Sequence, residues 1–183
     1  MFDRVGVVLA GGRSSRFGSD KFRHPVDGVE MGLRAVRCLS SCVDHVVVVG
    51  RHEVPDSFDA TALFGAREGS GPLGALLDVA DLVEGARLVV LPCDMPRMST
   101  ASMARLCREL EEGCWEAAFA SSTTLSEPQW LAGCWQTGPL LDEVRRYYDR
   151  GGRSVRDAAA LLRHVLVDLP ATELVNVNQL AQA

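Results

Sequence analysis

Three short, continuous apolar runs constrain the fold of this chain more than any other feature. They are residues 4–10 (RVGVVLA), 44–50 (DHVVVVG) and 87–92 (RLVVLP). A strand with one face in water alternates apolar and polar residues, whereas these runs place β-branched residues at consecutive positions. They therefore predict strands that are buried on both faces, as in a parallel sheet covered by helices.

Amphipathic segments alternate with these runs along the chain. Apolar residues recur at helical spacing over residues 30–41, 72–84, 99–111, 139–148 and 153–162. Further short strands are expected at residues 61–65, 115–120, 129–135 and 164–167. Strands that alternate with helices of about 10–15 residues indicate βαβ units. We predict one α/β domain over residues 1–183, a single doubly wound, mostly parallel sheet flanked by helices in a Rossmann-like arrangement.

Composition excludes several classes of protein. With 47% apolar and 23% charged residues, the chain is close to the globular average and is not disordered or fibrous. A formal net charge of −5 provides no basic field for nucleic acid, although a local basic pocket could bind a small anion. No segment has the roughly 18–20 uninterrupted apolar residues of a membrane span, so no membrane partner is expected. The six cysteines form no zinc-ligand pattern, and we expect buried free thiols in a cytoplasmic protein.

The segment after the first predicted strand, residues 9–21 (LAGGRSSRFGSDK), carries the strongest chemical signal. Gly11 and Gly12 let the backbone turn sharply and approach a ligand, and consecutive N–H groups in such a turn can bind an anion. The segment also carries cations that suit a triphosphate, namely Arg13, Arg16 and Lys21. The spacing matches neither the Rossmann nor the Walker glycine pattern. The segment therefore predicts a phosphate-binding loop of another type.

Asp94 carries the second signal, because it lies between two prolines directly after a buried run. A carboxylate at a strand end can hold Mg²⁺, which takes one or two carboxylates together with substrate phosphates. The alternative is an ordinary turn aspartate. Ligands of doubly wound sheets bind at the carboxyl ends of the strands, beside the topological switch point. Residues 11–21 and 92–96, which both follow predicted strands, are therefore the candidate active-site segments.

Two further segments carry weaker signals. The turn at residues 69–74 (GSGPLG) could let a flat base lie against the backbone, and Glu68 could accept hydrogen bonds from a base edge. A plain turn and a solvated carboxylate are the alternatives. Asn176 and Asn178 lie on one face of an extended segment, where they could offer donors and acceptors to a polar ligand. A capping or turn role is the alternative for this pair.

Together these segments resemble the molybdenum cofactor guanylyltransferase family. The matching segments, spread over nearly the whole chain, are residues 9–21, 71–73 (GPL), 92–96 (PCDMP) and 175–178 (VNVN). The first is specific for small-molecule nucleotidyltransferases as a group, and the last two narrow the resemblance to the molybdenum cofactor branch. The resemblance implies a nucleotidyltransferase fold of the doubly wound kind. It also implies transfer of GMP from GTP to the terminal phosphate of molybdenum-bound molybdopterin, with release of pyrophosphate.

The resemblance also implies roles for individual residues. The expected nucleotide-binding and cofactor-binding residues are Leu9, Ala10, Gly11, Gly12, Lys21, Glu68 and Asp94. The expected catalytic residues are Arg16, Lys21 and Asp94, and Asp94 is the expected Mg²⁺ ligand. The terminal asparagine pair is associated with substrate binding. The expected partners are GTP as co-substrate, a molybdopterin-type substrate and, transiently, molybdoenzymes or cofactor-synthesis proteins.

The chain departs from the family pattern at three places. Val49-Gly50 stands where the family often has a strand-end asparagine, Glu68 is the nearest counterpart of a nucleotide-contacting aspartate, and Gln179-Leu180 replaces a Thr-Pro. Two alternatives stay open. One is a related transferase that uses CTP or acts on a sugar phosphate, and the other is a catalytically silent homologue that binds nucleotide or pterin. The two loop cations and the strand-end carboxylate favour an enzyme.

Overall fold

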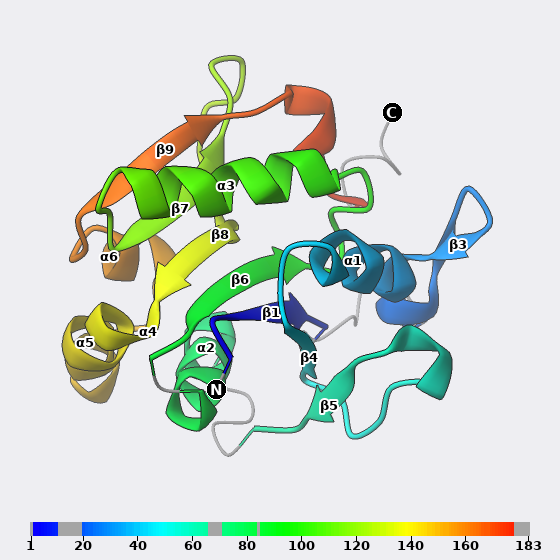
Figure 1. Cartoon of the computed structure of the whole chain (residues 1–183), viewed down its shortest axis with the longest axis horizontal. Helices are drawn as coiled ribbons and strands as arrows, with labels where there is room; N and C mark the ends of the chain where they lie inside the picture. Colours follow the sequence, from blue (N-terminus) through cyan, green and yellow to red (C-terminus); the bar gives the residue numbers. More distant parts are fainter. Residues whose placement is uncertain (1, 11–19, 66–70, 84, 178–183) are drawn as a thin grey trace.

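The computed structural model of the chain describes residues 2–10, 20–65, 71–83 and 85–177. Its centre is a seven-stranded sheet with the order β5-β4-β1-β6-β8-β7-β9 (Figure 1). Within this sheet β8 runs antiparallel to β6 and β7, and the remaining neighbours pair in parallel. The predicted doubly wound, mostly parallel sheet flanked by helices is confirmed.

The elements follow the predicted order. The strands of the large sheet are β1 (Arg4–Leu9), β4 (His45–Val49), β5 (Thr61–Leu63), β6 (Arg87–Pro92), β7 (Ala117–Ser121), β8 (Gln129–Gln136) and β9 (His164–Asp168). The helices are α1 (Met31–Ser40), α2 (Gly71–Leu82), α3 (Thr100–Glu112), α4 (Thr137–Pro139), α5 (Arg145–Asp149) and α6 (Val155–Ala159). A π-helical turn, Leu140–Val144, joins α4 to α5, and short 3₁₀ turns lie at Lys21–Arg23, Asp56–Phe58 and Ala171–Glu173. A separate two-stranded ribbon pairs β2 (Pro25–Val26) with β3 (Val29–Glu30).

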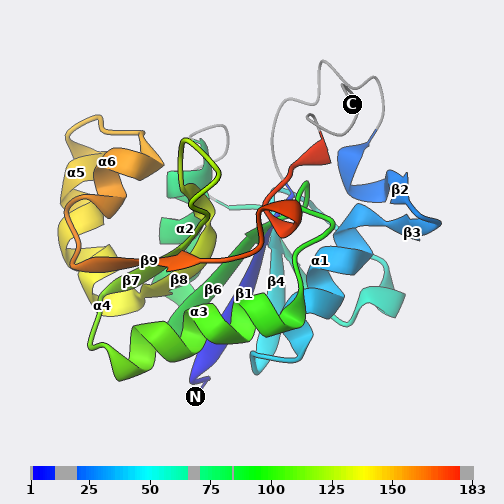
Figure 2. The same cartoon turned by 90° about the horizontal axis from the view of Figure 1, so that it is seen from above.

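Helices cover both faces of the sheet, and this explains the continuous apolar runs. Helices α1 and α3 pack on one face, and α2 with α4–α6 packs on the other (Figures 1 and 2). Neighbouring strand residues therefore enter different clusters, as Val8 does on the first face and Val7 on the second. Because both faces are buried from Val5 to Leu9, no position in this part of β1 selects for a polar side chain.

The strand order places the switch point beside β1. The strands β4 and β5 extend the sheet on one side of β1, and the chain then returns through α2 to place β6 on the other side. The C-terminal ends of β1 and β6 are directly paired through Leu9 and Pro92. In doubly wound sheets this edge is where ligands bind.

Three features differ from the sequence-based expectation. The expected helix at 139–148 contains the π-helical turn, and the expected helix at 153–162 is reduced to α6. Apolar spacing over a single turn does not distinguish an α-turn from a π-turn. The β2–β3 ribbon was not predicted, because each strand has two residues and its main signal is the Asp27-Gly28 turn, with φ of 50° and 76°.

Among the described helices, none has the length and apolar character needed to cross a bilayer.

Candidate nucleotide-binding site

The candidate site lies where β1, β4 and β6 end side by side. Leu9 pairs with Val49 on one side and with Pro92 on the other. The Ala10 N–H donates to the Val49 carbonyl at 3.0 Å, and the Cys93 N–H donates to the Leu9 carbonyl at 3.1 Å. The strand end that precedes the glycine loop is therefore fixed by hydrogen bonds from both neighbouring strands.

These hydrogen bonds limit which backbone groups at the end of β1 can bind a ligand. The Ala10 N–H and the Leu9 carbonyl are already paired within the sheet edge. Further backbone donors must therefore come from residues beyond Ala10. Of the predicted site residues, Gly11, Gly12, Arg16, Glu68 and Asn178 lie outside the described residues.

Lys21 and Asp94 meet directly at this edge, although they are 73 positions apart in the chain. The Lys21 Nζ donates to Asp94 Oδ2 at 2.9 Å, and the two side chains are 20% and 25% exposed. A charge-assisted hydrogen bond of this length is among the stronger polar contacts in proteins. Lys21 and Asp94, one residue from each candidate segment, therefore meet beside the switch point, and both side chains are partly exposed.

Local sequence explains why Lys21 points toward this edge. The Asp20 carboxylate accepts the Phe22 N–H at 3.1 Å and caps the 3₁₀ turn that begins at Lys21. The Phe22 ring is buried, and it packs so closely on Gly32 that a Cβ there would lie 2.4 Å from the ring. The turn is thus anchored at its cap and at its aromatic residue, which leaves the side chain of Lys21 directed at Asp94.

A second ion pair, between Asp20 and Arg51, was not predicted from the sequence. Arg51 Nη1 and Nη2 donate to the two Asp20 carboxylate oxygens at 2.9 and 2.8 Å. These hydrogen bonds hold the pKa of the Asp20 carboxyl below its ordinary value. The available signal was weak: Arg51 is a cation that follows Gly50, directly after the predicted second strand.

The C-terminal segment approaches Asp94 from another direction. The Val177 N–H donates to the Asp94 carbonyl at 2.9 Å, and Glu173 Oε2 accepts the Ser99 N–H at 3.0 Å. Asn176 Oδ1 is buried and has no hydrogen-bond partner among the described residues. An unpaired buried acceptor is costly, so this amide is a candidate contact for a polar ligand beside Asp94.

Burial keeps most of the thiols protonated. It raises the pKa of Cys93, next to Asp94, to about 12, and the neighbouring carboxylate adds to the effect. A thiol in that state is not a nucleophile at neutral pH. Cys38, Cys42, Cys107 and Cys134 are also buried, as expected, whereas Cys114 is exposed and corrects that expectation.

Asp94 suits Mg²⁺ as a single carboxylate ligand, with the rest of the coordination shell supplied by water and substrate phosphates. Within the described ranges, no three His, Cys, Asp or Glu side chains gather as a metal cage. Mg²⁺ commonly binds through one or two carboxylates and completes its shell with waters and substrate phosphates. Asp94 supplies a partly exposed carboxylate that already attracts a cation, the Lys21 ammonium. The site therefore suits an ion that arrives with a polyphosphate.

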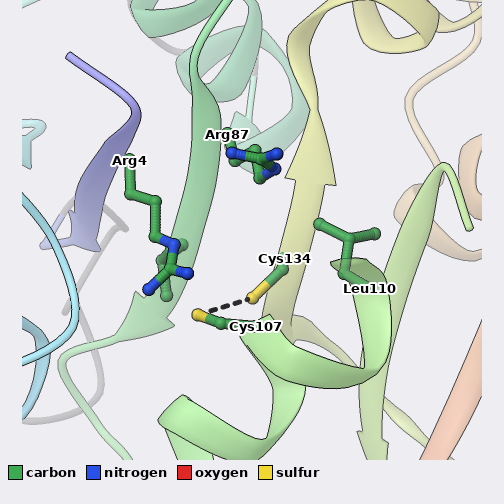
Figure 3. A pocket seen from close by; sticks show the side chains of 6 residues that line it. Arg4, Arg87, Cys107, Leu110 and Cys134 are labelled. Carbon is green, nitrogen blue, oxygen red and sulfur yellow. Dashed lines mark hydrogen bonds between the residues drawn. The ribbon is translucent and has the colours of Figure 1, made fainter. Parts of the chain in front are cut away.

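A small hollow at the opposite edge of the sheet has a different character (Figure 3). Its lining residues are Arg4, Arg87, Val89, Cys107, Leu110 and Cys134. The two thiol sulfurs lie 3.5 Å apart, and both arginines pair with Glu111 nearby. Because Arg4 and Arg87 begin β1 and β6, this hollow is at the far end of the strands from Lys21 and Asp94.

A doubly wound sheet with a paired cation and carboxylate beside its switch point defines the chain as an α/β protein with a candidate site for phosphates. A model of the MobA-like NTP transferase domain matches residues 6–167, and the chain belongs to this family. The resemblance drawn from the sequence motifs is thereby confirmed.

Curated relatives match nearly the full length of the chain. The molybdenum cofactor guanylyltransferase of Ralstonia nicotianae is 30% identical over 195 residues, which cover 98% of this chain and 94% of that protein. The protein of the same name from Xanthomonas euvesicatoria pv. vesicatoria is 33% identical over 160 residues, covering 86% of this chain and 77% of the relative.

Solved structures share the fold. Molybdopterin-guanine dinucleotide biosynthesis protein A from Archaeoglobus fulgidus superposes with a TM-score of 0.77 at 20% identity, covering 95% of this chain and 92% of that one. The 2-C-methyl-D-erythritol 4-phosphate cytidylyltransferase of Thermus thermophilus gives a TM-score of 0.72 at 15% identity, covering 97% and 95%. Both comparisons show the fold alone, because the names of the two proteins refer to different nucleotides although they share one scaffold.

Proposed function

We propose that this protein transfers GMP from GTP to the phosphate of molybdenum-bound molybdopterin and releases pyrophosphate, a step in molybdenum cofactor biosynthesis. Family membership over residues 6–167 and relatives named for this activity support the assignment. The structural observation that carries it is the pair of Lys21 Nζ and Asp94 Oδ2, 2.9 Å apart beside the switch point. A cation for phosphates and a carboxylate for Mg²⁺ are both required at one place by this chemistry.

The reaction needs positioning and charge neutralisation more than covalent help from the protein. An oxygen of the acceptor phosphate forms a bond to the α-phosphorus of GTP. The bond from that phosphorus to the bridging oxygen breaks, and pyrophosphate leaves with the electron pair. The acceptor phosphate is already ionised at neutral pH, so no general base is required.

Each proposed residue has one task in this scheme. Lys21 holds the triphosphate, and Arg16 offsets the charge that builds on the α-phosphate and the departing pyrophosphate. Asp94 holds Mg²⁺, which when bound neutralises phosphate oxygens. Asn176, whose buried Oδ1 has no hydrogen-bond partner among the described residues, contacts the polar substrate next to Asp94. Gly11 and Gly12 provide backbone N–H donors to the phosphates.

We further propose that GTP is preferred over CTP and ATP. Guanine offers donors at N1 and N2 and an acceptor at O6. We propose that the Glu68 carboxylate accepts from the donors and that a backbone N–H after Ala10 donates to O6. A wrong base leaves buried polar groups unpaired, at about 1–3 kcal/mol each. Two such groups would give a preference on the order of a hundredfold or more.

The decisive experiment measures pyrophosphate release with each nucleoside triphosphate, with and without molybdenum-bound molybdopterin and Mg²⁺. We expect release with GTP that requires both the acceptor and the metal. Release with CTP would instead support a cytidylyltransferase. Binding of GTP with no release under any condition would support a catalytically silent homologue. We also propose that the protein is cytoplasmic. We propose that it makes transient contact with molybdoenzymes or cofactor-synthesis proteins.

A further inference from the structure

Arg51 is a cation close to the candidate site that has no role in the proposed reaction. It follows the end of β4, and its guanidinium makes a two-pronged contact with Asp20 at 2.9 and 2.8 Å. The same guanidinium lies 4.6 Å from the centre of the Phe22 ring. Its side chain is 23% exposed, and its Nε is buried without a hydrogen-bond partner in the described part of the chain. The contacts of the Arg51 side chain are therefore with the turn at residues 20–22, and most of the side chain is shielded from solvent.

The two groups that Arg51 contacts are the residues on either side of Lys21. Asp20 is the cap of the turn, and its Oδ1 also accepts the Phe22 N–H. Phe22 is the aromatic anchor of the same turn, stacked on Phe58 with centroids 5.5 Å apart. Fixing both neighbours restricts the backbone of Lys21, because the position of a residue follows from the residues before and after it.

The contacts form a continuous chain across the ends of three adjacent strands. Arg51 lies after β4, the turn of Lys21 lies between, and Asp94 follows β6, while β1 stands between β4 and β6 in the sheet. We propose that Arg51 is a positioning residue, which holds the turn at residues 20–22 so that the Lys21 ammonium is placed over the end of β1 beside Asp94. The inference rests on the proposed function only in assigning phosphate binding to Lys21.

Arginine suits this task better than lysine would. Its planar fork matches both oxygens of one carboxylate, and its flat face stacks on an aromatic ring at the same time. A lysine ammonium would keep the charge but lose the second hydrogen bond and the stacking. Bidentate geometry is also the case in which a partly exposed ion pair gains more than the usual small stabilisation.

The chain provides an unusually direct probe, because Lys21 is its only lysine. Isotope-labelled lysine therefore gives one side-chain NMR signal, which reports the position and mobility of this ammonium without any assay of turnover. We expect Arg51→Gln to shift this signal toward that of a free lysine and to increase its mobility. The matched control is Arg23→Gln, which removes an arginine of the same turn that pairs with Glu30 at 2.9 Å.

Kinetics test the consequence for the reaction. We expect Arg51→Gln to lower kcat for pyrophosphate release about 10- to 100-fold, the scale of a displaced catalytic group, with the KM for the acceptor unchanged. Arg23→Gln should leave kcat near the wild-type value, and Arg51→Lys should restore part of it. Thermal unfolding of each variant separates misplacement of Lys21 from loss of the fold.

The outcomes are separable. An unchanged Lys21 signal in a folded Arg51→Gln protein overturns the inference, whatever the activity. A shifted signal with kcat unchanged overturns the catalytic consequence. If the wild-type protein releases no pyrophosphate, the proposed function fails, and the NMR comparison still decides whether Arg51 positions Lys21. Should Arg51→Gln not fold, Asp20→Asn removes the charge from the other side of the pair while keeping an oxygen to cap the turn.

Discussion

At the scale of single residues, the site concentrates its described chemistry in one ammonium and one carboxylate. Lys21 is the only lysine among the 19 basic residues of the chain, and it contacts Asp94. All the other basic residues are arginines, so this position is the one at which the chain uses an ammonium. A compact, strongly hydrated charge on a flexible stem can follow a phosphate group as it moves, which a rigid guanidinium does less easily.

We predict that Asp94→Asn abolishes Mg²⁺-dependent turnover and leaves the fold intact. The amide preserves the shape of the side chain but loses the negative charge that binds a hard cation. The backbone contact from Val177 to the Asp94 carbonyl is unaffected by the change. Pyrophosphate release across an Mg²⁺ titration is the measurement, with circular dichroism as the check of folding. Near wild-type turnover at saturating Mg²⁺ would contradict the metal-binding role.

We predict that Lys21→Ala lowers kcat/KM for GTP by an amount equivalent to about 2–4 kcal/mol, the scale of one well-placed electrostatic contact. Lys21→Arg, which keeps the charge on a different frame, should lose less. Steady-state kinetics on GTP measure both variants, and Arg23→Gln serves as the control for removing a charge from the same turn. An unchanged kcat/KM in the alanine variant would exclude phosphate binding by this residue.

At the scale of elements, the antiparallel strand β8 joins the two halves of the sheet through its contacts with β6 and β7. Gly133 pairs with Val90 on one side and with Phe119 on the other, next to a register shift in the β7–β8 pairing. A Cβ at this position would lie 2.3 Å from the Ala118 carbonyl oxygen. Because that atom belongs to the backbone, the strands would have to move apart to accept a side chain.

We therefore predict that Gly133→Ala destabilises the protein by about 1–3 kcal/mol, the usual cost of overpacking a core. Gly138 provides the matched control, since it is exposed and a Cβ there would meet no atom within 4 Å. Gly138→Ala should stabilise by roughly 0.4–1 kcal/mol through the unfolded chain. Urea unfolding measures both changes. Equal effects at the two positions would show that the close approach of β7 and β8 does not limit this site.

Much of this element structure was predictable, for a physical reason. Burial on both faces removes polar residues from strands such as β1, β4 and β6, so these strands stand out in the sequence. The direction of β8 leaves no such mark, because a buried strand has the same composition whichever way it runs. The two-residue strands β2 and β3 are too short to show a period at all.

The meeting of Lys21 and Asp94 was predictable to the same extent. Parallel strands bring their carboxyl ends to one edge, so the loops that hold Lys21 and Asp94 were expected there. Which strand lies beside β1 is a property of the whole topology. The pairing of Asp20 with Arg51, 31 positions apart, therefore could not be derived from local patterns.

At the scale of the whole molecule, one set of groups makes the free energy of unfolding depend on pH in acid, and another set does so in alkali. Asp44 Oδ2 accepts the N–H groups of Asp3 and Arg4 at 2.8 and 3.0 Å, and these hydrogen bonds lower the pKa of the Asp44 carboxyl. Arg51 lowers the pKa of Asp20 in the same direction. A carboxyl whose folded pKa is depressed contributes stability above its unfolded pKa, near 3.8, and that contribution is lost as pH falls through the folded value.

The buried thiols act in the opposite direction. Burial raises the pKa of Cys38 and Cys93 to about 12 and that of Cys42 to about 11, from an ordinary value near 9.0. A group whose folded pKa is raised contributes its full stability below the unfolded pKa. The contribution declines as pH rises from that value to the folded one, because the unfolded chain loses the proton first.

We therefore predict that the free energy of unfolding falls below about pH 4 and again above about pH 9. Each of the three thiols Cys38, Cys42 and Cys93 should add up to about 1.4 kcal/mol per pH unit to the alkaline decline, the value of one proton per unit. Urea unfolding at a series of pH values, with a reducing agent that keeps the thiols free, measures both limits. Asp44→Asn should flatten the acid decline alone, and Cys38→Ala should lower stability throughout but flatten the alkaline decline. An alkaline slope that is the same with and without Cys38 would show that burial of this thiol does not control its ionisation.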